Sequence, residues 1–174
     1  MPRLPVVTQP SDANREAYEY IKKTRGSVRG GFAVMLASTE VTQRIAHVGT
    51  YVRFESGLPP VMRELAVLTA SAQLENPVES AIHERACREL GVPDAILAAL
   101  RSRLPVEGAG GDEGLAIIFA LELTRDHRLS DATFQAARTR LGDRGVIDLI
   151  ATVGYYAMLA VCHVALDLRP GPPS

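Results

Sequence analysis

Two helical segments joined by a short turn, residues 59–91, constrain this chain most strongly. The stretch reads PPVMRELAVLTASAQLENPVESAIHERACRELG. Pro60 suits the first turn of a helix, and apolar residues follow it at helical spacing. Asn76 is a helix cap with Pro77 in the first helical position, and Gly91 ends the second segment. The pattern predicts two neighbouring helices that form a helical hairpin over residues 59–91.

The rest of the chain has the same helical spacing, interrupted by glycine and proline. No stretch alternates like a half-buried strand, so the sequence predicts an all-α protein. We expect Val41, Ile45, Val48 and Val52 to face the interior in one helix, and Leu115, Ile118, Phe119 and Leu123 in another. Further helices are expected at about 12–25, 40–55, 94–103, 112–127, 131–141 and from 143 onward.

Length and composition limit the domain organisation and the partners. With 174 residues, 47% of them hydrophobic, the chain can bury one complete core, so a single domain over residues 1–174 is expected. Residues 1–10 are expected to form an extended arm and residues 168–174 a flexible tail. The formal charge of −1 gives no reason to expect nucleic acid or an anionic membrane as a partner.

The sequence favours a cytoplasmic location. The N-terminus carries three prolines and no long apolar run, unlike a signal peptide. The apolar stretch Val146–Leu166 contains Asp148 and His163, so it is interpreted as a buried core helix rather than a membrane span. Cys87 and Cys162 lie far apart in sequence, which does not suggest a disulfide scaffold.

A histidine and two glutamates in the hairpin form the strongest candidate site. Glu79 and His83 are four residues apart and therefore share one face of a helix. Glu64 can reach His83 from the neighbouring helix. A histidine between carboxylates is sufficient to move protons at neutral pH.

Each of these residues also has a purely structural interpretation. His83 and Glu79 can form an exposed ion pair of little energetic value. Glu79 also stands three residues after the cap, where the acid of a capping box belongs. Glu64 follows Arg63 and can form an ion pair at the start of its helix.

Two longer segments resemble the carboxymuconolactone decarboxylase-like family, which is related to the alkylhydroperoxidase D-like proteins. They read YVRFESGLPPVMRELAVLTAS followed by NPVESAIHERACRELGVPDAILAAL, and LSDATFQAARTRLGDRGVIDLIATVGYYAMLAVCHVALD. Together the similar parts extend from about Phe32 to Asp167. The resemblance implies an all-α bundle of about seven or eight helices that assembles into homo-oligomers such as trimers or hexamers.

The peroxidase branch of this family has a signature in which a glutamate is followed by cysteine, histidine, cysteine and a final histidine. In this chain the glutamate corresponds to Glu64 and the final histidine to His83. The intervening positions hold Asn76, Val78 and Glu79, so both cysteines are replaced. Peroxide reduction by a cysteine pair needs a reactive thiolate and a resolving partner. The sequence therefore argues against a thiol peroxidase.

The decarboxylase-like branch retains the glutamates and the histidine. The resemblance implies cofactor-independent chemistry on small lactones or related carboxylic acids, in aromatic catabolism or secondary metabolism. We expect His83 to act as the acid/base residue, with Glu64 and Glu79 as orienting or relay groups. The expected activity is that of a lyase or an isomerase on a small anionic substrate.

Metal binding is the alternative use of such a cluster. Glu64, Glu79 and His83 are three conceivable ligands, but no HExxH-type spacing and no second clustered histidine accompany them. We therefore predict neither a metal nor another cofactor.

The last helix and the segment YVRFES supply candidate substrate contacts. Tyr156 and His163 lie on one stripe of an apolar helix, and they either line the pocket or satisfy each other or a backbone carbonyl in the core. Arg53 is the candidate for binding a substrate carboxylate, or else pairs with a nearby glutamate. Phe54 is either a pocket wall or a core residue.

Two rival functions remain at this point. One is a non-catalytic binding or scaffold protein that keeps the helical oligomer. The other is a thiol-based antioxidant protein, which the loss of both signature cysteines disfavours.

Overall fold

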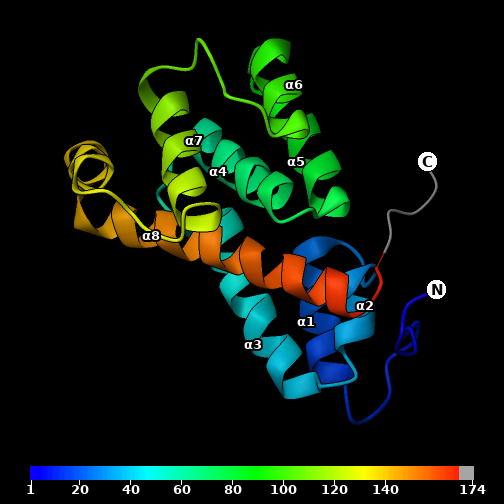
Figure 1. Ribbon diagram of the computed structural model, residues 1–174. Coiled ribbons are helices and arrows are strands. Elements are labelled where there is room, and N and C mark those ends of the chain that lie inside the picture. Colours follow the sequence, from blue (N-terminus) through cyan, green and yellow to red (C-terminus); the bar gives the residue numbers. More distant parts are fainter. Residues whose placement is uncertain (169–174) are drawn as a thin grey trace. The chain divides into compact units, whose positions relative to one another are not determined.

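The computed structural model describes residues 1–168 and divides into two compact units (Figure 1). The first unit contains residues 1–55 and the residues from Val161 onward, and the second contains residues 56–160. Within residues 1–168 there are eight α-helices, one π-helix and no strand, which confirms the predicted all-α class. The single domain expected over residues 1–174 stays a prediction, because this division does not show whether the units fold independently.

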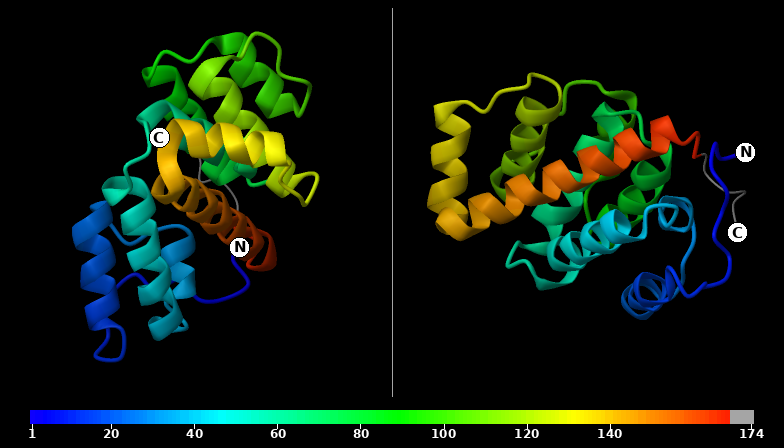
Figure 2. Two further views of the ribbon diagram at one scale, coloured as in Figure 1. Left: turned by 90° about the vertical axis from the view of Figure 1, so that its left-hand side faces the viewer. Right: turned by 90° about the horizontal axis from the view of Figure 1, so that it is seen from below.

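The first unit is built around the contact between helices α1 (Arg15–Arg25) and α3 (Thr39–Thr50), which lie side by side in Figures 1 and 2. Its core combines Ala17 and Ile21 with Leu36 and Ala46, all of them buried. Its elements are α1 (Arg15–Arg25), α2 (Gly31–Met35), α3 (Thr39–Thr50) and the π-helix η1 (Tyr51–Glu55).

The buried face of α3 differs from the one predicted. Val41 and Val48 are 55% and 48% exposed, so their expected place in the core is wrong. The buried positions of α3 are Thr42, Ala46, Gly49 and Thr50. Small side chains permit close approach of α1, and the Arg25 Nη2 atom donates to the Ala46 carbonyl at 2.9 Å.

The N-terminal segment, for which the sequence predicts an extended arm, has no helix before α1. Backbone hydrogen bonds nevertheless attach it to the first unit. The Arg3 N–H donates to the Leu166 carbonyl at 3.0 Å, and the Val7 N–H donates to the Ala33 carbonyl at 2.8 Å. The expected flexible tail falls almost entirely on residues 169–174, which lie outside the described residues.

The second unit contains the predicted hairpin. Its first helix, α4, packs against both α5 and α7. Met62, Leu65 and Leu68 of α4 are buried in one apolar cluster, and Ala66 and Ala70 are buried in another with Phe119. The helices are α4 (Pro60–Gln73), α5 (Pro77–Glu89), α6 (Asp94–Ser102), α7 (Gly111–Thr124) and α8 (Asp131–Ala165), whose residues after Ala160 belong to the first unit.

The buried face of α7 also departs from the prediction at one position. Phe119 is fully buried as expected, whereas Ile118 is 39% exposed. Ala116, Ile117 and Ala120 are buried instead. Most of α7 is apolar on every side, so the spacing of its large residues alone does not define the inward face.

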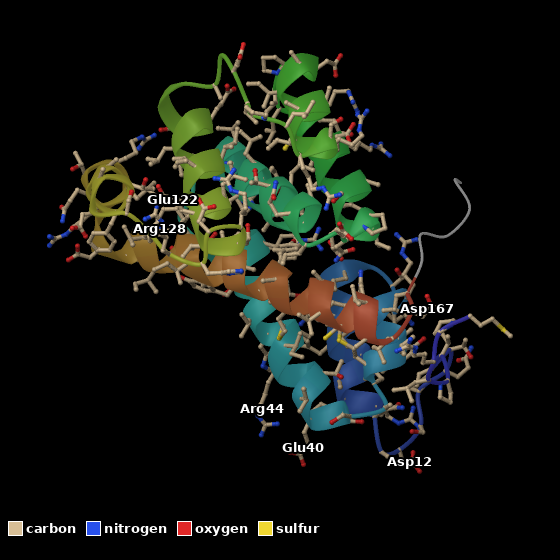
Figure 3. All side chains as sticks on the ribbon, viewed as in Figure 1. Asp12, Glu40, Arg44, Glu122, Arg128 and Asp167 are labelled. Carbon is tan, nitrogen blue, oxygen red and sulfur yellow. The ribbon has the colours of Figure 1, made fainter. Side chains whose placement is uncertain are left out.

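The start of α8 is capped by a carboxylate from α7. Figure 3 shows Glu122 beside the connection that leads into α8. One Glu122 oxygen accepts the Ser130 N–H at 2.7 Å, and the other accepts the Ser130 and Thr133 hydroxyls at 3.0 Å each. The backbone hydrogen bond, followed by those two hydroxyls, keeps the pKa of Glu122 below its usual value.

The long helix α8 is interrupted at Gly142, where the backbone adopts φ 70° and ψ 175°. The sequence predicts this break between the segments 131–141 and 143 onward. Within residues 1–168, α8 is the one helix that is long and apolar enough to cross a membrane, and 50% of its most apolar window is buried. A buried core helix can meet the same criteria of length and composition, so one such helix is weak evidence for a membrane span.

Replacement by alanine is expected to change the stability in opposite directions at two glycines of α8. Gly142 lies in a backbone region that is essentially restricted to glycine, so Gly142→Ala is expected to destabilise the protein by about 1–3 kcal/mol. Gly154 lies in regular helix and a Cβ there meets nothing within 4 Å, so Gly154→Ala is expected to stabilise the protein by up to about 1 kcal/mol. Urea unfolding of both variants checks the signs. Equal effects would contradict this account of the break.

Candidate active site

Local helix chemistry places the two candidate residues of α5. The Asn76 Oδ1 atom accepts the Glu79 N–H at 3.3 Å, and Pro77 occupies the first turn. From this capped start, Glu79 and His83 follow one helical turn apart on the same face. The antiparallel hairpin then brings this face against Glu64 of α4.

His83 lies between two carboxylates. Its Nδ1 atom is 2.6 Å from Glu64 Oε2, which is a short charge-assisted hydrogen bond. Its Nε2 atom is 3.5 Å from Glu79 Oε2, an ion-pair distance that is longer than a strong hydrogen bond. The structure therefore brings together the three residues that the sequence marks as catalytic candidates.

The geometry removes two of the structural interpretations. His83 is only 4% exposed, so it does not form a surface pair with Glu79. The Asn76 N–H donates to the Ser71 carbonyl, whereas the Glu79 carboxylate faces His83. The backbone N–H of Glu79 thus takes part in the cap of α5, but the Glu79 carboxylate does not complete a reciprocal capping box.

Glu64 is held as a carboxylate by two cationic donors. Its second oxygen, Oε1, accepts from Arg63 Nε at 3.2 Å, so the expected ion pair at the helix start is also present. Burial alone would raise the pKa of Glu64. The hydrogen bond and charge of His83, together with the charge of Arg63, outweigh burial and lower this pKa below its usual value.

The same contacts favour the protonated form of His83. Burial alone would lower the pKa of His83, but the contacts with Glu64 and Glu79 outweigh it and raise this pKa above its usual value. With His83 protonated, the charges of His83 and Arg63 balance those of Glu64 and Glu79. A buried, charge-balanced cluster of this kind can store a proton and transfer it over a short distance.

Two tyrosines of α8 complete the surroundings of His83. The Tyr156 ring lies edge to face against the His83 ring, with centroids 4.8 Å apart. Tyr155 packs against Tyr156 in the same manner at 5.2 Å. Tyr156 is 2% exposed, so its ring restrains the orientation of the imidazole. The sequence singles out Tyr156 but gives no signal for this ring contact, which joins distant segments.

The cluster is arranged for hydrogen bonding rather than for a shared metal. Each carboxylate approaches a different nitrogen of the His83 ring, so the three side chains do not converge on one point. Across residues 1–168, no group of three histidine, cysteine, aspartate or glutamate side chains is placed to hold a metal ion.

Cys87, one turn after His83, lacks the features of a reactive thiol. It is fully buried, and burial together with the charges of Glu64 and Glu84 raises its pKa to about 12. Cys162 is partly exposed, and burial raises its pKa to a smaller extent. Neither environment provides the lowered pKa that a peroxidatic cysteine needs.

This difference predicts selective alkylation. At pH 8 only about one in ten thousand Cys87 thiols is ionised, so iodoacetamide is expected to modify Cys162 slowly and Cys87 only after unfolding. Mass spectrometry of tryptic peptides measures both sites. Rapid alkylation of Cys87 in the folded protein would contradict the buried position of its thiol.

The remaining candidate residues, Arg53, Phe54 and His163, belong to the first unit, and their part in substrate binding stays a prediction. Phe54 is 57% exposed, which excludes its interpretation as a core residue, and the Arg53 guanidinium lies 5.1 Å from its ring centroid. In the described part of the chain, no carboxylate forms an ion pair with Arg53. His163 is 6% exposed, and a Cβ at Gly31 would come within 2.9 Å of its Nε2 atom.

The second unit also contains an apolar pocket of about 340 Å³ that the sequence does not indicate. It lies among the ends of α4 and α7 and one face of α8. Its lining residues are Leu74, Leu123, Thr124, His127, Ile150, Val153, Gly154 and Ala157.

Solved structures with this arrangement of helices define the fold class. An uncharacterised peroxidase-related protein from Ralstonia eutropha JMP134 with an alkylhydroperoxidase D core aligns over 98% of this chain and 92% of its own, with a TM-score of 0.74 and 18% identity. A peroxidase-related protein from Silicibacter sp. TM1040 aligns over 97% and 90%, with a TM-score of 0.73 and 19% identity. The debrominase Bmp8 aligns over 97% and 92%, with a TM-score of 0.74 and 13% identity. At these identities the similarity establishes an alkylhydroperoxidase D-like fold.

The family follows from the sequence of the central region. Residues 39–119, which include Glu64, Glu79 and His83, match the sequence model of the carboxymuconolactone decarboxylase family. This match agrees with the resemblance to the carboxymuconolactone decarboxylase-like family that the sequence indicates. Comparison with curated proteins gave no match.

Proposed function

We propose that this protein is a cofactor-independent acid/base enzyme that acts on a small lactone or an enolisable carboxylic acid. The observation that carries the proposal is the buried histidine with one carboxylate at each ring nitrogen. Such a cluster of a histidine and two carboxylates can remove a proton next to a carbonyl and return it to another atom of the same molecule. The match of residues 39–119 to the model of the carboxymuconolactone decarboxylase family supports this class of chemistry.

The reaction is either decarboxylation or isomerisation, so the enzyme is a lyase or an isomerase. In both cases the substrate carbonyl accepts the electron pair of the broken bond, which removes the need for a cofactor. The residues assigned to proton movement are His83, Glu64 and Glu79. Arg53 is assigned to the substrate carboxylate by its geometry as a bidentate donor.

Three further residues are assigned to the walls of the substrate pocket: Tyr156, His163 and Phe54. We further propose that the substrate is small and anionic and that the protein is located in the cytoplasm. No nucleic-acid or membrane partner is proposed. Comparison with the debrominase Bmp8, one variant of which is solved with 2,3,4-tribromopyrrole, is compatible with a small ring compound as ligand. The scaffold alternative is less well supported, because it predicts a solvent-facing His83.

A panel of small lactones and β-keto or unsaturated acids tests the proposal in D₂O. We expect loss of CO₂, a change in ultraviolet absorbance, or deuterium uptake at an enolisable carbon, and we expect it without added metal or cofactor. Exchange that is identical in the presence of wild-type protein and of His83→Gln would overturn the assignment.

The enzyme is also proposed to be a homo-oligomer, a trimer or a hexamer. Exposed apolar residues of α8 support this, among them Ile147 at 63% and Ile150 at 40% exposure. Light scattering at micromolar concentration is expected to give a mass three or six times that of the 18.8 kDa chain. A monomeric mass would contradict the proposal.

A further inference from the structure

The two nitrogens of His83 are both committed to other side chains of the cluster. Nδ1 faces Glu64 at 2.6 Å, and Nε2 faces Glu79 at 3.5 Å. The ring edge-to-face contact with Tyr156 and the 4% exposure leave little room for a further molecule at the imidazole. A substrate proton therefore has no direct path to His83 in this arrangement.

Glu64 is committed in the same way. One of its oxygens accepts from His83 and the other accepts from Arg63 at 3.2 Å. Its side chain is 13% exposed. With both oxygens occupied by cationic donors, Glu64 is the anchored end of the cluster and not a group that meets the substrate.

Glu79 differs from Glu64 in the contacts of its two oxygens. Only its Oε2 atom faces His83, at a distance longer than a strong hydrogen bond. Within residues 1–168, its Oε1 atom has no hydrogen-bond or ion-pair partner. Its side chain is 16% exposed, close to the 13% of Glu64, and its backbone is fixed by the Asn76 cap. An acceptor oxygen on a fixed backbone position is thus open to a bound molecule.

We propose that Glu79, rather than His83, exchanges the proton with the substrate, and that His83, Glu64 and Arg63 form a relay behind it. This inference rests on the proposed function and assigns a direct role to the residue expected only to orient or relay. In the enolisation step, the Glu79 carboxylate takes a proton from the carbon next to the substrate carbonyl. The C–H electron pair becomes the C=C bond of the enolate, and the carbonyl π pair moves to oxygen.

The return step restores the carboxylate. The protonated Glu79 gives its proton to a carbon of the enolate, which becomes a ketone or lactone again. Between the steps, Glu79 can pass its proton to His83 only when His83 is neutral, and His83 carries it toward Glu64. For a substrate that loses CO₂, the C–C pair forms the enolate, and the relay supplies the proton that Glu79 then delivers to carbon. Arg63 is a positioning residue because its guanidinium donates to Glu64, which in turn holds His83.

One experiment measures the openness of each carboxylate without any substrate. Carbodiimide and glycine methyl ester convert accessible carboxylates to amides, and mass spectrometry locates the labelled residues. We expect Glu79 to be labelled at least ten-fold faster than Glu64, with Glu89 of the same helix as the exposed reference. Faster labelling of Glu64 than of Glu79 would overturn the inference.

A second experiment compares turnover of variants on α-angelica lactone, a small lactone with an enolisable carbon, and on any compound identified by the panel. We expect Glu79→Gln to lower deuterium exchange at least about 100-fold. Glu79→Asp is expected to recover part of the rate. The control Glu89→Gln removes an exposed α5 carboxylate paired with Arg85 and is expected to leave the rate unchanged.

The His83 titration separates a direct role of Glu79 from a structural one. NMR is expected to give a His83 pKa above its ordinary value in Glu79→Gln, because Glu64 still holds Nδ1. Glu79→Gln with full activity would overturn the inference. If the wild-type protein turns over no compound while Glu79 is the faster-labelled carboxylate, the proposed function fails and the assignment of the open carboxylate stands.

Discussion

Replacement of His83 by glutamine is expected to lower turnover by about two to four orders of magnitude while the helical fold persists. Glutamine can donate a hydrogen bond to Glu64, but it cannot accept and release a proton near neutral pH. The proton link between Glu64 and Glu79 is thereby broken. The rate of deuterium exchange or CO₂ release measures the effect, and circular dichroism verifies the helices.

The matched control is His47→Gln, which makes the same change at an exposed histidine of α3. This variant is expected to retain wild-type turnover and stability within about 0.5 kcal/mol. If His83→Gln loses activity together with its helical signal, the loss reports folding and not proton transfer. Retained turnover with intact helices would exclude His83 from the reaction.

Helix boundaries were predictable because they depend on local backbone chemistry. Asn76 caps α5 through its side chain, and Gly142 interrupts α8 because it adopts a backbone conformation that other residues avoid. Such signals need no knowledge of the tertiary structure. The end of the helix predicted to about Glu55 is an exception, because the chain changes from α3 to a π-helix at Tyr51 without a glycine or proline.

Inward faces were less predictable because packing selects them. Apolar spacing predicted Val41 and Val48 to be buried, but α3 buries the small residues Ala46 and Gly49 instead. Close approach of neighbouring helices favours small side chains, and the larger valines remain outside. The spacing rule indicates that a helix has an apolar side, not which contact the fold makes.

In the candidate site, too, local helix geometry was predictable and contacts between distant segments were not. Helix geometry alone places Glu79 beside His83, and the family resemblance indicates that Glu64 faces them. The 2.6 Å bond to Glu64, the use of Arg63 as its second partner and the Tyr156 ring all depend on contacts between distant segments. Spacing therefore indicates which residues take part, but not which carboxylate remains open.

Replacement of Glu64 by glutamine is expected to destabilise the protein by about 3 kcal/mol at pH 6, because one member of a buried ion pair is removed. The size of the loss should depend on pH. The pKa of His83 is raised in the folded state, so its stabilising contribution is complete below about pH 6.5 and is lost as the pH rises through the folded value.

Glu64 contributes in the opposite direction. Its pKa is lowered in the folded state, so its contribution is complete above about pH 4.3 and is lost as the pH falls through the folded value. The difference in unfolding free energy between wild type and Glu64→Gln is therefore expected to be largest between about pH 4.5 and 6.5. It should decrease on either side of that range.

Urea unfolding from pH 4 to 9 measures this difference, with Glu89→Gln as the exposed control on α5. NMR titration is expected to show a lower His83 pKa in Glu64→Gln than in the wild type, because the short hydrogen bond to Nδ1 loses its charged acceptor. A difference that stays constant across the pH range would show that Glu64 stabilises the fold by packing alone. In that case the carboxylate would not hold His83 in its protonated form, and the relay would lose its anchored end.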